Sequence, residues 1–178
     1  MGAMKIATDA KSLANSNDLR GAPWRRVLVA AALLALGGCA GGDVVFKEHR
    51  AGYVPDVAAK VATVDWAGAK PVDVTLSEFQ FSPARLTFRT GVPYRLRLRN
   101  TGDRSHTFVS EDFFKAIAVG KFVTPEGEIV EPYVGKVALR PGAEKELLFV
   151  AVRPGTYHLA CTIPLHEAFG MKGEIVVR

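Results

Sequence analysis

The sequence predicts an all-β sandwich with one helix-containing insertion, preceded by a leader segment and a tether. From residue 71 onward, short segments that alternate apolar and polar side chains follow one another, and turns rich in proline and glycine separate them. Short strands at such intervals are typical of two packed antiparallel sheets. With 178 residues, 48% of them hydrophobic, the chain is long enough for one domain with a buried core.

The first 39 residues have the composition of a targeting segment. Arg25 and Arg26 precede an apolar run over residues 27–36, which is too short to cross a bilayer as a permanent helix. The run closes with Leu-Gly-Gly-Cys39, which resembles the bacterial lipobox, whose cysteine becomes the lipidated first residue of the mature protein. We therefore expect residues 1–39 to be a lipoprotein signal peptide and Cys39 to carry the lipid.

The lipid would anchor the chain to a membrane of the bacterial cell envelope, facing the periplasm. Ala40, rather than an aspartate, follows Cys39, which favours the outer membrane over the inner one. An ordinary cleaved signal or an uncleaved anchor is the alternative, and the paired arginines leave the twin-arginine and general export routes open. Residues 1–38 hold five basic and two acidic residues, so their removal lowers the formal net charge from +5 to +2. Nucleic-acid binding then loses its support.

Residues 40–70 are expected to form a tether with a short helix capped by Asp56, and residues 71–178 to form the folded domain. The expected strands are 72–76, 86–89, 94–98, 145–152, 156–161 and 174–177. The third strand alternates three apolar side chains, which face the core, with three arginines on its other face. This basic stripe is either a solvated or guarded sheet face or a dock for an acidic partner.

Between the third and fourth strands lies an insertion with its own helix. Ser110 is expected to cap this helix, acidic residues follow at its positive end, and Gly120 is expected to terminate it. Residues 122–134 are expected to form a hairpin that turns at residues 125–128.

Cys161 is the second of the two cysteines and the one that the lipid does not use. An unpaired thiol in an oxidising compartment should itself become oxidised unless something protects it. A bound metal is such a protection, because a coordinated thiolate is no longer free to react. Cys161 is therefore a candidate metal ligand.

The segment after Cys161 supplies further ligands at short spacing. A loop returns His166 after four intervening residues, and Met171 follows after four more, where the next strand begins. Thiolate, imidazole and a weakly held thioether form the ligand set of an electron-transfer copper site, which one more histidine completes. His106, at the end of an earlier strand, supplies it. The sequence therefore predicts a site for one copper ion made by His106, Cys161, His166 and Met171.

The same residues lie in motifs that resemble the cupredoxin superfamily, which includes plastocyanin and azurin. The motifs are Leu86-Thr-Phe-Arg-Thr-Gly91, Leu98-Arg-Asn100, Ser105-His106-Thr-Phe, Pro154-Gly-Thr-Tyr157 and the loop with Cys161, His166 and Met171. The resemblance covers residues 71–178 and is strongest to bacterial single-domain cupredoxins, including the cupredoxin-like domain of periplasmic iron-uptake proteins. It implies a cupredoxin-type Greek-key β-sandwich.

The resemblance also implies a function. It implies a type 1 (blue) copper site that cycles between Cu(II) and Cu(I), in a monomeric one-electron carrier that is not an enzyme. The partner would be a redox protein such as a c-type cytochrome or a terminal oxidase. Electrons would pass through His166 at an exposed edge, and the docking patch around it would be Pro164, Leu165, Ala168 and Phe169.

Three further residues near the site are Met171, His158 and Thr107. Met171 is either the axial ligand or a core side chain. His158 lies on the strand face opposite to Cys161, so it is not expected to bind the metal. Many family members follow the first histidine with an asparagine that steadies the cysteine loop, whereas Thr107 occupies that place here. The hydrogen bonds around the site, and with them the potential, are therefore expected to differ.

Rival functions are a copper chaperone or copper-tolerance protein that uses the same site, and a metal-free interaction module. Methionine-rich tracts would favour copper handling, but Met171 is the only methionine after Cys39. All four candidate ligands are retained, which disfavours the metal-free module. A multicopper oxidase needs a His-Cys-His motif and a dinuclear site needs two cysteines in the loop, and the sequence has neither pattern.

Overall fold

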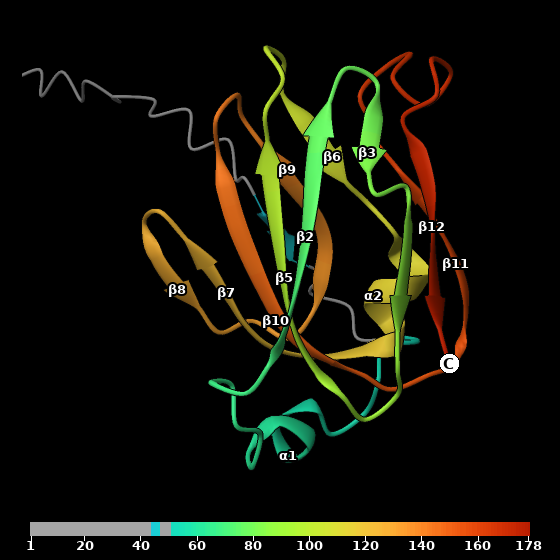
Figure 1. Ribbon diagram of the computed structural model, residues 1–178. Coiled ribbons are helices and arrows are strands. Elements are labelled where there is room, and N and C mark those ends of the chain that lie inside the picture. Colours follow the sequence, from blue (N-terminus) through green and yellow to red (C-terminus); the bar gives the residue numbers. More distant parts are fainter. Residues whose placement is uncertain (1–43, 47–50) are drawn as a thin grey trace, which may run out of the picture. The chain divides into compact units, whose positions relative to one another are not determined.

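Strands make up most of the described part of the chain, which comprises residues 44–46 and 51–178 of the computed structural model (Figure 1). The strands are β1 (Val44–Phe46), β2 (Lys70–Ser77), β3 (Gln80–Ser82), β4 (Arg85–Phe88), β5 (Pro93–Asn100), β6 (His106–Phe108), β7 (Ile117–Thr124), β8 (Gly127–Ile129), β9 (Val134–Leu139), β10 (Glu144–Ala151), β11 (Gly155–Ala160) and β12 (Lys172–Val177). The helices are α1 (Val57–Val61) and α2 (Glu111–Ala116). None of the described helices is long and apolar enough to cross a membrane. The predicted signal peptide, its Cys39 and the start of the predicted tether lie outside the described residues.

The strands form one large and two small sheets. The large sheet has the order β3-β2-β5-β10-β7-β8, and the small sheets have the orders β1-β9-β6 and β11-β12-β4. β2 runs parallel to β5 and β12 runs parallel to β4, while the other paired strands are antiparallel. Figure 1 draws β4, β11 and β12 on the right and β7 and β8 on the left. The predicted all-β sandwich with a helix-containing insertion is confirmed.

The core lies between the large sheet, the β11-β12-β4 sheet and α2. Phe149 of β10 contacts Phe88 of β4 and Phe113 of α2, with ring centroids 5.1 and 5.5 Å apart. Leu159 of β11 and Ile175 of β12 are fully buried in the same cluster. Burial of one such side chain contributes about 1.5–3 kcal/mol. The strand ends around the predicted site therefore rest on a well-packed core.

The alternation predicted for β5 is confirmed. Tyr94, Leu96 and Leu98 expose at most 5% of their surface, and the arginines of the strand lie on its other face. Arg95 and Arg97 both pair with Glu146 of β10, at 3.0 and 3.1 Å, and Arg97 also pairs with Asp73 of β2 at 3.2 Å. Acidic neighbours thus already neutralise these two arginines, which supports a solvated sheet face rather than a dock for an acidic partner.

The segment before β2 packs onto the domain. Val57 of α1 belongs to a second buried cluster with Ala118 of β7 and Val150 of β10. Asp56 precedes the helix, as predicted, but it has a left-handed φ of 53° and its side chain makes no cap hydrogen bond. Residues 51–69 of the predicted tether therefore belong to the packed structure, which begins before residue 71.

The insertion departs from prediction at two residues. Helix α2 ends at Ala116, and Gly120 lies inside β7 instead of ending the helix. A Cβ atom at Gly120 would collide with the ring of Trp66, so packing and not helix termination requires glycine there. Ser110 makes no cap bond, because its hydroxyl donates to the carbonyl oxygen of His158 at 2.6 Å and ties α2 to β11. The predicted hairpin is present between β7 and β8.

Candidate metal centre

Three of the four predicted ligands converge where β11 leads into its loop. His106 begins β6, Cys161 follows β11, and His166 lies in the loop between β11 and β12. Their ligand atoms all lie within 4.8 Å of one another, and all three residues are buried. The Nδ1 atoms of the two histidines are 3.2 Å apart, and Cys161 Sγ is 3.5 Å from His166 Nδ1. One sulfur and two imidazole nitrogens therefore face a common point.

The fourth predicted ligand, Met171, lies directly before β12. The Cys161 N–H donates to the carbonyl oxygen of Met171 at 3.1 Å, and the Met171 N–H donates to that of His166 at 2.9 Å. Its side chain is completely buried. The backbone thus keeps Met171 beside two ligands, but burial suits a core side chain equally well, so axial ligation stays a prediction.

The loop between Cys161 and Met171 is held by its own backbone. His166 N–H donates to the carbonyl oxygen of Ile163 at 3.1 Å, and Phe169 N–H donates to that of Leu165 at 3.0 Å. Leu165 has a φ of 69°, in the left-handed region, which costs a non-glycine residue on the order of 1 kcal/mol. The hydrogen-bonded loop therefore keeps His166 in place with Leu165 in a strained conformation.

Thr107 joins the strand of the first histidine to the loop of the cysteine. Its N–H and its Oγ1 lie 3.3 and 3.5 Å from Cys161 Sγ, and its Oγ1 accepts a hydrogen bond from Thr162 N–H at 2.8 Å. Donors directed at the sulfur favour the thiolate, which is the form that binds metal. Thr107 thus steadies the cysteine loop, a role that the resemblance assigned to an asparagine at this position.

The second histidine, His166, lies in an apolar environment. Its ring meets Phe79 edge-on with centroids 4.9 Å apart, and Phe79 in turn contacts Phe169 at 5.1 Å. Burial is the largest cause that lowers the pKa of His166 below its usual value, and electrostatic interactions with His106 and Arg104 lower it further, while Glu78 acts in the opposite direction. The imidazole is therefore neutral at pH 7, as metal binding requires.

Glu78 contacts the first histidine and was not singled out by the sequence. Its Oε1 lies 3.3 Å from His106 Nε2 and accepts a hydrogen bond from Arg104 N–H at 2.9 Å. Desolvation would raise the pKa of Glu78, but hydrogen bonds from its own backbone, Arg104 and His106 outweigh it and lower that pKa. The parallel pairing of β2 with β5, which ends at Leu76 and Asn100, brings the two loops together. Glu78 could have been predicted to lie near His106 only if the parallel pairing of β2 with β5 had been predicted from the sequence.

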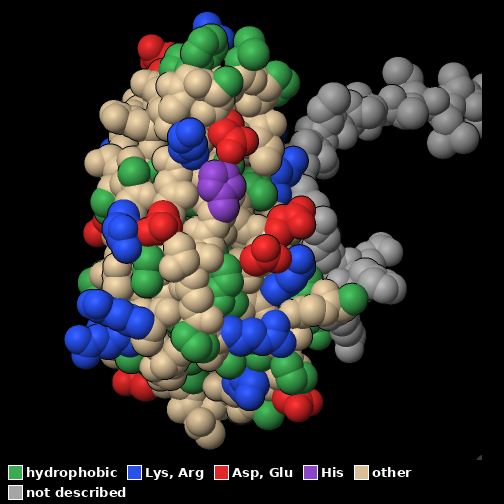
Figure 2. Space-filling model, turned by 90° about the vertical axis from the view of Figure 1, so that its right-hand side faces the viewer, with side chains coloured by type: hydrophobic (Ala, Val, Ile, Leu, Met, Phe, Trp, Pro, Cys, Tyr) green, Lys and Arg blue, Asp and Glu red, His purple; other side chains and the backbone are tan. Residues whose placement is uncertain are grey.

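An exposed apolar patch covers the centre. Figure 2 shows hydrophobic side chains gathered at the top of the molecule, the end at which Figure 1 draws the loop between β11 and β12. Leu165 and Phe169 expose 67% and 63% of their surface. All four predicted patch residues are exposed: Pro164, Leu165, Ala168 and Phe169. His166 itself is buried, with 5% exposed, so the exposed edge expected at this histidine is formed by the patch instead.

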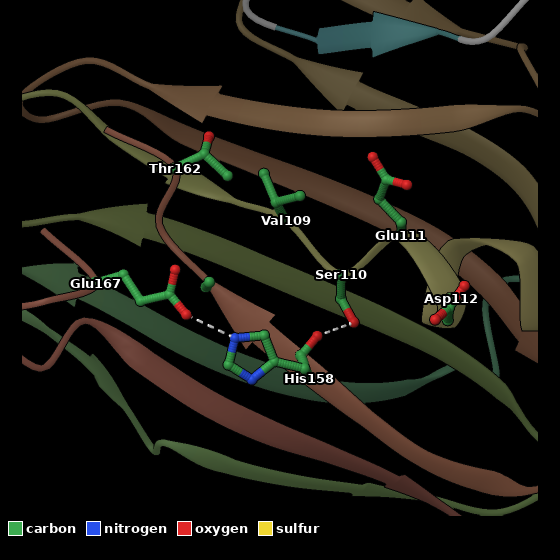
Figure 3. Close-up of a pocket in the computed structure, with 8 residues that line it drawn as sticks. Val109, Ser110, Glu111, Asp112, His158, Thr162 and Glu167 are labelled. Atoms are coloured by element: carbon green, nitrogen blue, oxygen red, sulfur yellow. Dashed lines mark hydrogen bonds and ion pairs between the residues drawn. The ribbon is translucent and has the colours of Figure 1, made fainter. Parts of the chain in front are cut away.

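A separate groove of about 320 Å³ lies between the start of α2 and β11 (Figure 3). His158 lines it, and its Nε2 is 2.9 Å from Glu167 Oε1. Cys161 and Leu159 are buried whereas His158 is exposed, as the alternation along the strand predicted. His158 is not among the three clustered ligands.

The donor set fits copper. A thiolate, two imidazole nitrogens and a neighbouring thioether are soft or borderline ligands, which suit copper and disfavour the oxygen-seeking Mg²⁺ and Ca²⁺. Both imidazoles direct Nδ1 at the common point, and Thr107 donates to the sulfur. His106, Cys161 and His166 would hold the ion, with Met171 as the predicted weak ligand.

The fold and this centre define a β-sandwich protein in which one cysteine and two histidines form a buried candidate metal site. The chain belongs to the cupredoxin-like domain family, whose model matches residues 56–177. It is 33% identical to the copper-resistant cuproprotein CopI of Rubrivivax gelatinosus over 112 residues, which are 61% of this chain and 67% of that protein. The family and the cluster of ligands together support one copper ion as the cofactor.

Solved structures share the fold. Auracyanin from Roseiflexus castenholzii is 24% identical with a TM-score of 0.45, and the match covers 62% of this chain and 99% of that one. The McoA multicopper oxidase from Aquifex aeolicus is 15% identical with a TM-score of 0.51, and the match covers 65% of this chain and 30% of that one. The chain thus spans about a third of the length of this oxidase, and the likeness shows the fold alone.

Proposed function

We propose that the protein is a mononuclear type 1 copper protein that carries single electrons in the bacterial cell envelope. The observation that supports this best is the burial of the centre beneath an exposed apolar patch. His106, Cys161 and His166 expose 0%, 1% and 5% of their surface, whereas Leu165 and Phe169 expose more than half. An ion at such a depth is shielded from exchange with solvent, while an electron has only a thin layer of side chains to cross.

The surrounding residues hold the predicted copper ligands in place, so the ligands need to move little when the copper changes its oxidation state. Bound copper would supply a one-electron couple between Cu(II) and Cu(I). Thr107 donates to the Cys161 sulfur and accepts from Thr162, which links β6 to the cysteine loop. Backbone hydrogen bonds hold His166, and the ring of Phe79 restrains its imidazole and keeps water away. Ligands fixed in this way rearrange little when the charge of the centre changes, which favours fast electron transfer.

The apolar patch is the proposed contact with a redox partner, such as a c-type cytochrome or a terminal oxidase. A small apolar contact separates readily, which suits a carrier that must meet two partners in turn. We propose no catalytic activity, because Cys161 stands between Ala160 and Thr162 and not between the histidines of a trinuclear copper site. The protein would act as a monomer.

Copper tolerance with the same site is the second candidate function. The similarity to a copper-resistant cuproprotein favours it. In that case the domain would bind or hand over copper rather than pass electrons. Such a protein must release its ion to a partner, which the burial of all three clustered ligands opposes.

The proposed location in the cell envelope rests only on the sequence of the expected lipoprotein signal peptide, residues 1–39, and on Ala40. Lipidation of Cys39 would anchor the protein to a membrane facing the periplasm, and Ala40 favours the outer membrane. Both residues lie outside the described part of the chain.

An absorption spectrum of the copper-loaded protein tests the site. We expect an intense blue or green colour from thiolate-to-copper charge transfer, which Cys161→Ser abolishes. A colourless protein with one copper per chain would contradict the site.

The function is tested by measuring two rates on one preparation: the rate of electron transfer to a small c-type cytochrome and the rate of copper transfer to a competing apoprotein. Fast reversible oxidation with retained copper supports the carrier, whereas slow redox chemistry with partner-driven loss of copper supports copper handling.

A further inference from the structure

We propose that Glu78 is a positioning residue for the first histidine ligand: it accepts a hydrogen bond from His106 Nε2–H and thereby keeps Nδ1 free to bind copper. The inference rests on the copper site of the proposed function and not on the electron-carrier role. It concerns the turn between β2 and β3, which is distant from the ligands in sequence.

The carboxylate of Glu78 is built into the loop that leads to His106. One oxygen, Oε1, lies 2.9 Å from Arg104 N and 3.3 Å from His106 Nε2. A Cβ atom at Gly102 would collide with both carboxylate oxygens, so the absence of a side chain there makes room for Glu78. The Glu78 side chain is 29% exposed and His106 is fully buried. The contact therefore joins a partly exposed carboxylate to the buried ring of His106, at Nε2, the nitrogen that does not face the metal centre.

The hydrogen bond determines which nitrogen of His106 carries the proton. A neutral imidazole has one N–H and one lone pair, and a carboxylate accepts but does not donate. If Nε2–H faces Glu78, the lone pair is on Nδ1, which lies 3.2 Å from His166 Nδ1 at the centre. In the metal-free protein His166 Nδ1–H then donates to His106 Nδ1, and His166 must change to its Nε2–H tautomer before its Nδ1 can bind copper as a neutral imidazole. A carboxylate behind a ligating histidine orients the ring and raises its basicity.

The two histidines are supported in different ways by neighbouring residues of one turn. Glu78 places a negative charge behind His106, whereas Phe79 places an aromatic edge against His166. His106 is therefore the stronger electron donor of the two. Because Cu(II) gains more than Cu(I) from a basic, negatively charged environment, Glu78 is expected to favour the oxidised state.

Two substitutions separate the hydrogen bond from the charge. Glu78→Gln keeps an oxygen that accepts from His106 and Arg104 but removes the charge. Glu78→Ala removes both. Asp103→Asn is the matched control, because Asp103 is an exposed carboxylate in the loop that leads to His106. Thermal unfolding of each metal-free variant establishes that it folds.

Nitrogen chemical shifts of the imidazoles in the metal-free protein report the tautomer directly. We expect the Nε2–H form of His106 in the wild type and in Glu78→Gln, and a mixture of both forms in Glu78→Ala. For the copper protein we expect Glu78→Ala to lose about 10–100-fold in Cu(II) affinity. We expect Glu78→Gln to raise the reduction potential, by about 59 mV for each tenfold fall in Cu(II) affinity relative to Cu(I) affinity.

Two results would overturn the proposal. One is an Nδ1–H form of His106 in the wild type. The other is an equal shift of the reduction potential in Glu78→Gln and Asp103→Asn, which would show that Glu78 acts only as a nearby surface charge. Failure of the protein to pass electrons to a cytochrome would leave the imidazole and affinity results unaffected, so the proposal and the carrier function can fail separately.

Discussion

Replacing Thr107 with valine tests whether one hydroxyl joins the two ligand-bearing segments. Valine keeps the backbone N–H, 3.3 Å from Cys161 Sγ, but removes Oγ1. That oxygen accepts from Thr162 N–H at 2.8 Å, lies 3.1 Å from the Thr162 hydroxyl, and lies 3.5 Å from the sulfur. The first two are ordinary hydrogen bonds, each with a net contribution of about 0.5–1.5 kcal/mol, and the third is long. Because Thr162 is exposed and water can replace part of the loss, we expect destabilisation by about 1–2 kcal/mol.

Thermal and urea unfolding of the metal-free protein measure this change. In a domain of this size the loss corresponds to a Tm lower by about 4–8 °C. Thr156→Val, at an exposed position of β11, is the control and should leave Tm nearly unchanged. With one donor to the sulfur removed, the thiolate donates more strongly to Cu(II), so the reduction potential should also fall. Equal Tm values and potentials in the two variants would refute the role assigned to Thr107.

Three further predictions concern the axial ligand, the patch and the anchor. Met171→Leu should retain copper and shift the potential upward, because loss of a donor disfavours Cu(II); an unchanged spectrum and potential would place Met171 in the core. Leu165→Glu should slow electron transfer to a cytochrome with little change in copper affinity, whereas Val130→Glu, at a position 78% exposed beyond β8, should not. Equal slowing by both would argue against the patch. Cys39→Ser should remove the full-length protein from the membrane fraction, and a soluble periplasmic wild type would contradict lipidation.

Local patterns in the sequence were sufficient for much of the fold. The apolar alternation in β5 and β11 gave the inward and outward faces correctly, including the exposed position of His158. Such periodicity is a property of the strand itself and needs no knowledge of its neighbours. The helix end at Gly120 was wrong, because the glycine serves the packing of Trp66, a residue far away in sequence. The part of the tether that packs on β7 and β10 was missed for the same reason.

The sequence by itself determined the class of protein and the candidate ligands, since Cys161, His166 and Met171 share one short loop whose spacing is read directly. Only the tertiary structure decided how these ligands are supported. Glu78 reaches His106 because β2 and β5 pair in parallel, and Phe79 covers His166 because the same turn folds over the loop between β11 and β12. Contacts between segments depend on strand order and register, and these emerge from the packing of the whole core rather than from any local run of residues.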